Sequence, residues 1–386
     1  MMKYSLTVCA VCFCICLFGM AIAFWVLPQK SFSKVEKRAL QPLPKPDGES
    51  VLSGDYRAKL DAFYADHFPL REEFVAVKAR AEMLLGKGEN NGILCGAGER
   101  LARRRFDMLT PQGTQTGVDF ASPWQVAAAC DGILRAGAAL QVPFAVLLPG
   151  RNLDVCPSAF SYPSDFSDAL VQDIRSRLSG QVAYPDLICR FRSAEESYYR
   201  TDHHWTTAGA YLGYCAAMEA LGRAEEILPE SEFERTVVSD SFRGTLWAAS
   251  GMHWIKPDRV EIWLRGNEAD FEVTADGRHP DGFYSPSKLT GGDDYAIFLD
   301  GTHDVVTIRK KTDAERPCLL ILRDSFASSM APFLAQHYDL VLLNLSSTRR
   351  DFTHLSALAG EYGADAVLLV YSIENLLTAN KLPRLQ

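Results

Sequence analysis

The stretch Cys318-Leu319-Leu320-Ile321-Leu322-Arg323-Asp324-Ser325-Phe326-Ala327 indicates the fold of this chain. Its continuous apolar run, which ends in polar residues, is typical of a strand buried on both faces of a parallel sheet. Ser325 follows the carboxyl end of that strand and precedes an expected helix at 326–337. Open α/β sheets place their sites at this edge, and the N–H groups of a helix start can bind an oxyanion. Ser325 is therefore a candidate nucleophile.

Strands and helices alternate along most of the chain around this stretch. The other strands expected from apolar runs are 142–148, 339–344 and 366–371, and the other expected helices are 124–140, 166–178, 206–221 and 352–362. Such alternation predicts an α/β fold with a mostly parallel sheet. The stretch 231–311 differs, because short β segments such as 260–264, 270–274, 295–299 and 305–308 are separated by turn residues. We interpret 231–311 as a β-rich insertion that shapes a substrate cleft.

A second polar stretch, Arg200-Thr201-Asp202-His203-His204-Trp205-Thr206-Thr207, precedes one of the expected helices. Either threonine at its end is a natural N-cap, so Asp202 and His204 lie in the extended approach to the helix. Residues i and i+2 of an extended segment point the same way, so these two side chains share a face and His203 takes the other. A carboxylate beside an imidazole fixes its tautomer and stabilises its protonated form. Together with Ser325, these residues predict a Ser-His-Asp site.

The same residues also have plain structural interpretations. Asp202 could cap a helix and His204 could be a satisfied polar residue, while Ser325 or Asp324 could cap the helix after the strand. Asp202, His203 and His204 could instead hold a metal ion. Adjacent histidines diverge in a strand or a helix and chelate one ion poorly, so we expect no metal and no other cofactor.

Composition and the N-terminus limit the function classes. The chain has 386 residues, 47% hydrophobic and 23% charged, with a net charge of −8 that gives no basis for binding nucleic acid. Residues 6–27 are uncharged and almost wholly apolar, long enough to cross a hydrocarbon core of roughly 30 Å. We interpret 1–29 as a signal-anchor transmembrane helix, with cleavage after Ala21-Ile22-Ala23 as the alternative. An extended linker at 30–54 and the α/β domain at 55–386 are expected to follow.

These motifs together resemble a known family. Asp202-His203-His204-Trp205 matches the signature of the DHHW proteins and is similar to the Asp-x-His-Trp element of the alginate O-acetyltransferases (AlgJ/AlgX-like) of the SGNH hydrolase superfamily. Arg323-Asp324-Ser325-Phe326 resembles their serine motif. Asp66-His67-Phe68-Pro69-Leu70-Arg71 and Phe242-Arg243-Gly244-Thr245-Leu246 resemble two further elements. The resemblance covers roughly 55–375 and implies an SGNH-hydrolase-like three-layer fold.

The resemblance also implies roles for individual residues. Ser325 would be the nucleophile, His204 the general base and Asp202 its orienting carboxylate. The expected substrate-binding residues are Trp205, Arg323 and Arg151, with core packing as the alternative for Trp205. The expected oxyanion donors are Ser325 and Gly301, with Gly150-Arg151-Asn152 as a second candidate by position.

Family members of known activity move acetyl groups onto or off extracellular polysaccharides. The resemblance therefore implies an extracytoplasmic O-acetyltransferase or acetylesterase with a polysaccharide acceptor, on a single-pass protein of the cell membrane. A multi-spanning membrane O-acyltransferase is the expected acetyl supplier. The stretch 341–347 lacks the Asp-x-Arg that often follows this strand in the family. That departure leaves open an inactive glycan-binding or assembly protein on the same fold.

Overall fold

The computed structural model describes residues 2–104, 122–160, 165–194, 196–290, 292–346, 351–378 and 381–386. The chain forms two compact units. The first unit contains Met1–Lys87 and Gly251–Trp254, and the second contains Gly88–Ser250 and Ile255–Gln386. The boundary near residue 87 differs from the predicted one at 54, because two helices after the expected linker group with the N-terminal part.

The first unit begins with α1 (Met2–Val26), in which Thr7–Val26 has the length and the mean hydropathy, 2.5, of a membrane span or a signal sequence. The predicted linker after it is partly folded rather than extended. It contains a short antiparallel pair, β1 (Phe32–Ser33) and β2 (Arg38–Ala39), and then α2 (Gly48–Ser53).

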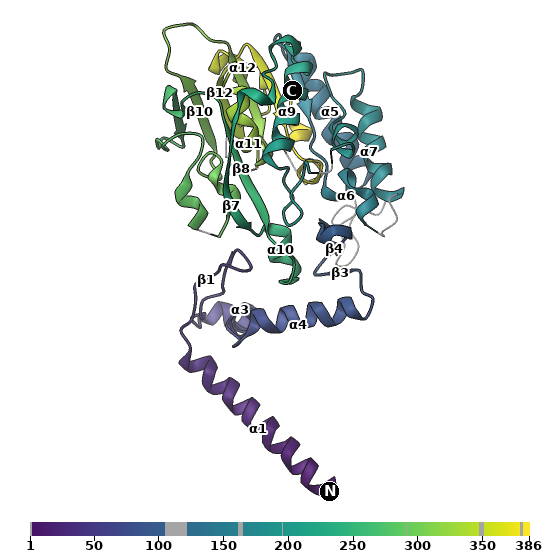
Figure 1. The fold of residues 1–386 in the computed structure, drawn as a ribbon, viewed down its shortest axis with the longest axis vertical. Coiled ribbons are helices and arrows are strands. Elements are labelled where there is room, and N and C mark those ends of the chain that lie inside the picture. Colours follow the sequence, from purple (N-terminus) through teal and green to yellow (C-terminus); the bar gives the residue numbers. More distant parts are fainter. Residues whose placement is uncertain are drawn as a thin grey trace. The chain divides into compact units, whose positions relative to one another are not determined.

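Two longer helices, α3 (Asp55–Asp66) and α4 (Arg71–Leu84), complete the first unit (Figure 1). Asp66 ties the linker to α3, because its carboxylate accepts hydrogen bonds from the Arg38 guanidinium at 2.9 Å and from the Gln41 N–H at 2.8 Å. These contacts hold the linker against α3, although solvent exposure of Arg38 limits its ion pair to at most about 1 kcal/mol.

A six-stranded sheet forms the centre of the second unit. Its order is β6 (Phe144–Leu147), β13 (Ala366–Val370), β11 (Cys318–Arg323), β12 (Asp339–Asn344), β10 (Val305–Lys310) and β9 (Phe271–Ala275). The first four strands are parallel, and β10 and β9 extend the sheet antiparallel. The predicted α/β fold with a mostly parallel sheet is confirmed.

Helices cover both faces of this sheet and make it a three-layer structure. On one face α9 (Thr207–Ala220) and α11 (Phe326–Leu334) pack against Leu319 and Ile321 of β11. On the other face α5 (Pro123–Ala139), α7 (Asp165–Leu178) and α12 (Leu355–Tyr362) pack against Leu320 and Leu322. Successive residues of a strand point to opposite faces, so one apolar run serves both cores. Each such buried leucine stabilises the fold by about 1.5–3 kcal/mol.

Only part of the stretch 231–311 lies outside the central sheet. β7 (Glu234–Phe242) and β8 (Asp258–Leu264) form an antiparallel pair, but β9 and β10 belong to the central sheet. The strand predicted at 295–299 is instead a short 3₁₀ helix, Asp294–Ile297. The positive φ values of Leu299 (53°) and Asp300 (61°) are incompatible with an extended strand at its end.

The remaining strands and α-helices are short. They are β3 (Glu89–Asn90), β4 (Ile93–Cys95), β5 (Leu101–Arg103), α6 (Asn152–Val155), α8 (Leu187–Arg192), α10 (Thr245–Ser250) and α13 (Ile373–Leu376). Several of them surround the carboxyl ends of the parallel strands, where Ser325 lies.

Candidate active site

The two polar stretches meet at the carboxyl end of β11. Ser325 follows the strand and precedes α11, and its backbone (φ −67°, ψ −19°) is already helical. Thr206 is the N-cap of α9, since its side chain accepts a hydrogen bond from the Gly209 N–H. The motif that precedes Thr206 therefore runs past the start of α11, at the edge of the sheet that favours functional sites.

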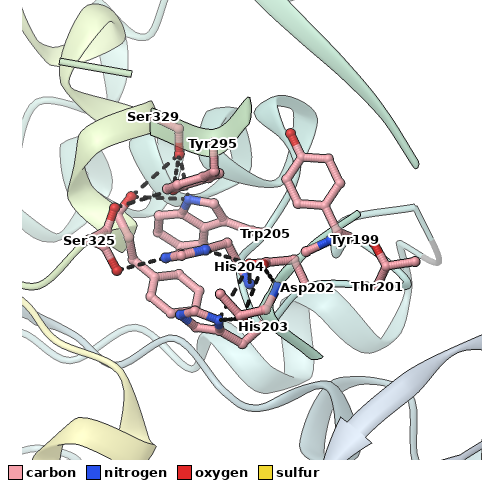
Figure 2. A network of polar contacts seen from close by, with 12 residues as sticks. Tyr199, Thr201, Asp202, His203, His204, Trp205, Tyr295, Ser325 and Ser329 are labelled. Atoms are coloured by element: carbon pink, nitrogen blue, oxygen red, sulfur yellow. Dashed lines mark hydrogen bonds and ion pairs between the residues drawn. The ribbon is translucent and has the colours of Figure 1, made fainter. Parts of the chain in front are cut away.

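Asp202, His204 and Ser325 form a continuous hydrogen-bonded series (Figure 2). His204 Nδ1 lies 2.6 Å from Asp202 Oδ1, and His204 Nε2 lies 2.6 Å from Ser325 Oγ. Because a carboxylate only accepts, Nδ1 carries the proton and Nε2 presents its lone pair to the Ser325 hydroxyl. This is the arrangement in which an imidazole can act as general base toward a serine.

The Asp202 carboxylate is buried and held from several sides. Its Oδ2 accepts from the Thr245 N–H at 2.7 Å and from the Thr245 hydroxyl at 3.1 Å, at the start of α10. Burial by itself would raise the pKa of Asp202, but the His203 and His204 imidazoles and these hydrogen bonds bring it well below its usual value. A Cβ on Gly244 would lie 2.2 Å from the Asp202 Cβ, so the residue before Thr245 has to be glycine.

The extended spacing predicts that His203 lies on the face opposite Asp202 and His204. In the structure His203 lies beside His204 instead. Its ring centroid lies 3.8 Å from that of His204, and its Nδ1 lies 2.8 Å from the Thr245 hydroxyl. Ligand atoms of Asp202, His203 and His204 lie within 4.8 Å of one another, close enough for a metal ion. A metal would, however, compete with the contacts that His204 makes with Asp202 and Ser325.

One side of the site is formed by the side chains of Tyr295, Ser329 and Trp205. The Tyr295 ring stacks on His204, and its hydroxyl lies 3.2 Å from the Ser325 carbonyl and 3.0 Å from Ser329 Oγ. The Trp205 indole N–H donates to the Phe326 carbonyl at 3.1 Å and to Ser329 Oγ at 2.9 Å. Trp205 is fully buried, a position that does not permit stacking on a sugar.

Arg323 and Asp324 organise the turn before the serine from inside. The Arg323 guanidinium donates to Ser328 Oγ at 3.1 Å and to the His303 carbonyl at 3.2 Å. Arg323 is 1% exposed, and its burial lowers its pKa to about 10. It supports the turn from a place that substrate does not reach.

The Asp324 carboxylate fixes the same turn to α13. It accepts hydrogen bonds from the Phe326 N–H at 3.0 Å and from the Ser372 N–H at 2.7 Å. The Asn375 amide adds a third hydrogen bond at 2.9 Å. Asp324 therefore accepts from the first N–H of α11, while Ser325 occupies the N-cap position without a side-chain capping bond and keeps its hydroxyl for His204.

A small pocket beside His203 and Phe326 is lined by Gly150, Arg151 and Asn152. Arg151 lies there but pairs with Asp154, with Nε–Oδ2 and Nη2–Oδ1 distances of 2.7 and 2.6 Å. A second cavity of about 800 Å³ lies beside the flanks of the motif and includes neither His204 nor Ser325 among its lining residues.

The candidate oxyanion donors differ in whether their backbone N–H groups already donate a hydrogen bond within the protein. The Gly301 N–H donates to the Phe298 carbonyl at 3.2 Å, so it is already engaged. Within the described ranges, the N–H groups of Ser325 and Gly150 donate to no protein acceptor. A Cβ on Gly150 would approach Ile188 Cγ1 to 2.9 Å, which explains the glycine there.

Comparison with known proteins agrees with this architecture. Residues 158–270 match the model of the SGNH hydrolase-like domain of the acetyltransferase AlgX. The fold is SGNH hydrolase-like. The comparison with curated protein sequences gives no match.

Solved structures share the fold of this chain at low sequence identity. A DHHW family protein from Eubacterium siraeum is 16% identical, with a TM-score of 0.57, over 77% of this chain and 96% of its own. Bacillus cereus PatB1 is 19% identical, with a TM-score of 0.59, over 76% of this chain and 99% of its own. PatB1 with a sulfonyl adduct gives 18% identity and a TM-score of 0.58, over 76% and 97%. The resemblance to DHHW and SGNH hydrolase-like proteins is confirmed.

The sequence contains no clear signal for Tyr295 and Ser329. Both are ordinary residues, and packing alone brings Tyr295 to His204 and Ser329 to the Tyr295 hydroxyl. Thr245 and Gly244 are different, because they fall in the element Phe242–Leu246 that already resembles the family, although that resemblance assigned them no role.

Proposed function

We propose that this chain is a serine-dependent O-acyltransferase or acetylesterase that acts on a cell-envelope or secreted polysaccharide. The observation that carries the proposal is the series of 2.6 Å contacts from Asp202 through His204 to Ser325. The match to the domain of an acetyltransferase supports the acyl group as an acetyl group.

In the proposed reaction the Ser325 hydroxyl attacks the acyl carbonyl while His204 Nε2 takes its proton. Asp202 keeps His204 in the required tautomer and stabilises the imidazolium that forms. When the tetrahedral intermediate collapses, His204 returns the proton to the leaving oxygen, and the acyl group remains on Ser325. A sugar hydroxyl or water then attacks this ester, with His204 again the base, and restores the free serine.

The negative charge of the intermediate needs donors on the side of the acyl carbonyl. We assign this role to the N–H groups of Ser325 and Gly150, which have no other acceptor among the described residues. The Ser325 N–H also lies at the start of α11, where the helix dipole favours negative charge.

The polysaccharide acceptor and the location follow from the family resemblance and from α1. Thr7–Val26 would hold the chain in the cell membrane as a single-pass anchor, with the SGNH hydrolase-like part outside the cytoplasm. A membrane-bound O-acyltransferase would then supply the acetyl group. No metal or other cofactor has a step in this scheme.

The proposal is tested by labelling the full chain with a fluorophosphonate and locating the adduct by peptide mass spectrometry. A sulfonyl fluoride serves as second probe, because the related PatB1 carries a sulfonyl adduct. We expect an adduct on Ser325 that disappears in Ser325→Ala and in His204→Ala but persists in Ser193→Ala, which removes an exposed serine elsewhere. A small acetyl ester, such as p-nitrophenyl acetate, controls for a pocket that excludes the probes.

Folded wild type that reacts with neither the probes nor the ester would contradict the proposal. Glycan binding that is equal in wild type and Ser325→Ala would then favour the non-catalytic alternative. If labelling occurs, oligosaccharide acceptors are supplied and the products are identified by mass spectrometry. Acetylated oligosaccharide indicates transfer, and free acetate indicates hydrolysis.

A further inference from the structure

The outward face of α4 is apolar. Phe74, Val77 and Leu84 are 53%, 66% and 81% exposed, and Leu85, just past the helix end, is 87% exposed. Their spacing places them on one side of the helix, whereas the fully buried Ala79 marks the opposite side. At roughly 25 cal/mol per Å² of apolar surface, leaving four large side chains in water is unfavourable by several kcal/mol. Such a face indicates a covering partner.

This apolar face continues to the end of the candidate membrane span. Phe24, near the end of α1, has its ring centroid 5.3 Å from that of Tyr64 in α3. Tyr64, Phe68 and Phe74 line one groove of about 440 Å³, and the rings of Phe68 and Phe74 are 6.0 Å apart. Apolar side chains therefore follow one another from the span, through the end of α3, onto α4.

Lys78 lies at the edge of the same groove, with its side chain 59% exposed and an ion-pair distance of 3.2 Å to Glu82. A lysine beside an apolar stripe is typical of a helix in a membrane interface, where the stem packs on acyl chains and the ammonium group reaches the phosphates. The amphipathic rings of Trp25 and Tyr64 also suit the boundary between lipid and water.

We propose that α4 lies along the surface of the bilayer that α1 enters, with Phe74, Val77, Leu84 and Leu85 in the headgroup region. The occupant of the apolar face is lipid, because the face is continuous with the one stretch of the described chain that has the length and hydropathy of a span. α4 has 14 residues, so the contact along the bilayer surface would be about 21 Å long. The inference goes beyond the proposed reaction, since it concerns only the first unit.

The test uses the full chain in nanodiscs of phosphatidylcholine and phosphatidylglycerol. A photoreactive p-benzoylphenylalanine replaces Phe74 or Leu84, which lie at the two ends of the face, and Glu225 in the second unit is the exposed control. We expect lipid adducts on irradiation of the variants at 74 and 84 and none at 225. Circular dichroism checks that each variant is folded.

Three results would overturn the inference. Lipid adducts at 74 without any at 84 would mean that α4 leaves the surface. Crosslinks at 84 to protein, within the chain or to a second copy, would identify a protein partner instead. The absence of adducts at both positions would mean that the face is in water. Fluorophosphonate labelling of Ser325 in the same nanodiscs is expected to be unchanged in all variants, so failure here is distinct from failure of the proposed function.

Discussion

The phenol ring of Tyr295 lies flat on the imidazole of His204, with ring centroids 3.8 Å apart and planes 7° apart. The Tyr295 hydroxyl also contacts the Ser325 carbonyl, so one buried side chain touches both the proposed base and the proposed nucleophile. Burial raises the pKa of Tyr295, and its phenol stays neutral. Tyr295 is therefore a positioning residue for both.

Tyr295→Phe and Tyr295→Leu separate the two contacts. Tyr295→Phe keeps the stack and loses the hydroxyl, so we expect a loss of about 1 kcal/mol in stability and labelling of Ser325 within a few-fold of wild type. Tyr295→Leu removes the stack, and we expect labelling to slow on the order of 10- to 100-fold because His204 is misplaced. The rate of Ser325 labelling is measured from samples quenched at successive times, and the free energy of unfolding from urea denaturation. Equal rates for the two variants would refute a role for the stack.

Asp202→Asn tests the tautomer of His204. An amide N–H beside Nδ1 favours the tautomer in which Nε2 carries the proton, which cannot accept the Ser325 hydroxyl proton. We expect Ser325 labelling to fall on the order of 10³- to 10⁴-fold, with the fold retained. Unchanged labelling in folded Asp202→Asn would show that His204 does not act as base in the assigned tautomer.

Gly244→Ala is expected to abolish labelling and to destabilise the protein, because its Cβ would lie 2.2 Å from the Asp202 Cβ. Gly360→Ala is the matched control, since a Cβ there meets nothing within 4 Å. In α12 this control is expected to stabilise the helix by up to about 1 kcal/mol. The two free energies of unfolding, from urea curves, are the measurement. A harmless Gly244→Ala would mean that Asp202 is not tightly enclosed.

His337 is expected to make stability depend on pH. Its Nε2 lies 2.8 Å from the Tyr214 hydroxyl, and burial, with a smaller effect of Arg223, lowers its pKa to about 4. In the unfolded protein His337 has a pKa of about 6.5. Between pH 6.5 and pH 4 it is therefore protonated in the unfolded state and neutral in the folded state. Its contribution to stability is therefore complete above pH 6.5 and is lost as pH falls toward 4.

Urea denaturation at steps between pH 7 and pH 4 measures this effect. We expect wild type to lose on the order of 1–3 kcal/mol more than His337→Gln across that window. Parallel curves for the two proteins would show that His337 protonates equally in the folded and unfolded states.

Much of the fold follows from local patterns. The runs at 318–322, 339–344 and 366–371 form strands because their leucines, isoleucine and valines pack into one of two cores, which makes length and hydrophobicity sufficient signals. The helix after Thr206 is equally clear, because an N-cap and apolar spacing agree. The meeting of Asp202, His204 and Ser325 was expected from strand-end placement together with the family resemblance.

Other features depend on distant packing and leave little local trace. The segment 295–299 has the composition of a strand, but tertiary contacts turn it into a 3₁₀ helix, and this conformation places Tyr295 on His204. His203 lies beside His204 because its Nδ1 contacts the Thr245 hydroxyl and lies near the Asp202 carboxylate, which His204 also contacts. The sequence predicts that Arg323 binds substrate, but in the structure its side chain is buried beneath the turn that carries Ser325.

The hydrogen bonds from Ser372 and Asn375 to Asp324 have a consequence for biosynthesis. The turn that presents Ser325 is completed by residues made after it, because Ser372 and Asn375 follow Asp324 by 48 and 51 positions in the chain. A chain still being synthesised would contain Ser325 without the partners that hold its turn. Premature termination before Ser372 would therefore remove the support of the Ser325 turn while leaving Asp202, His204 and Ser325 in the sequence.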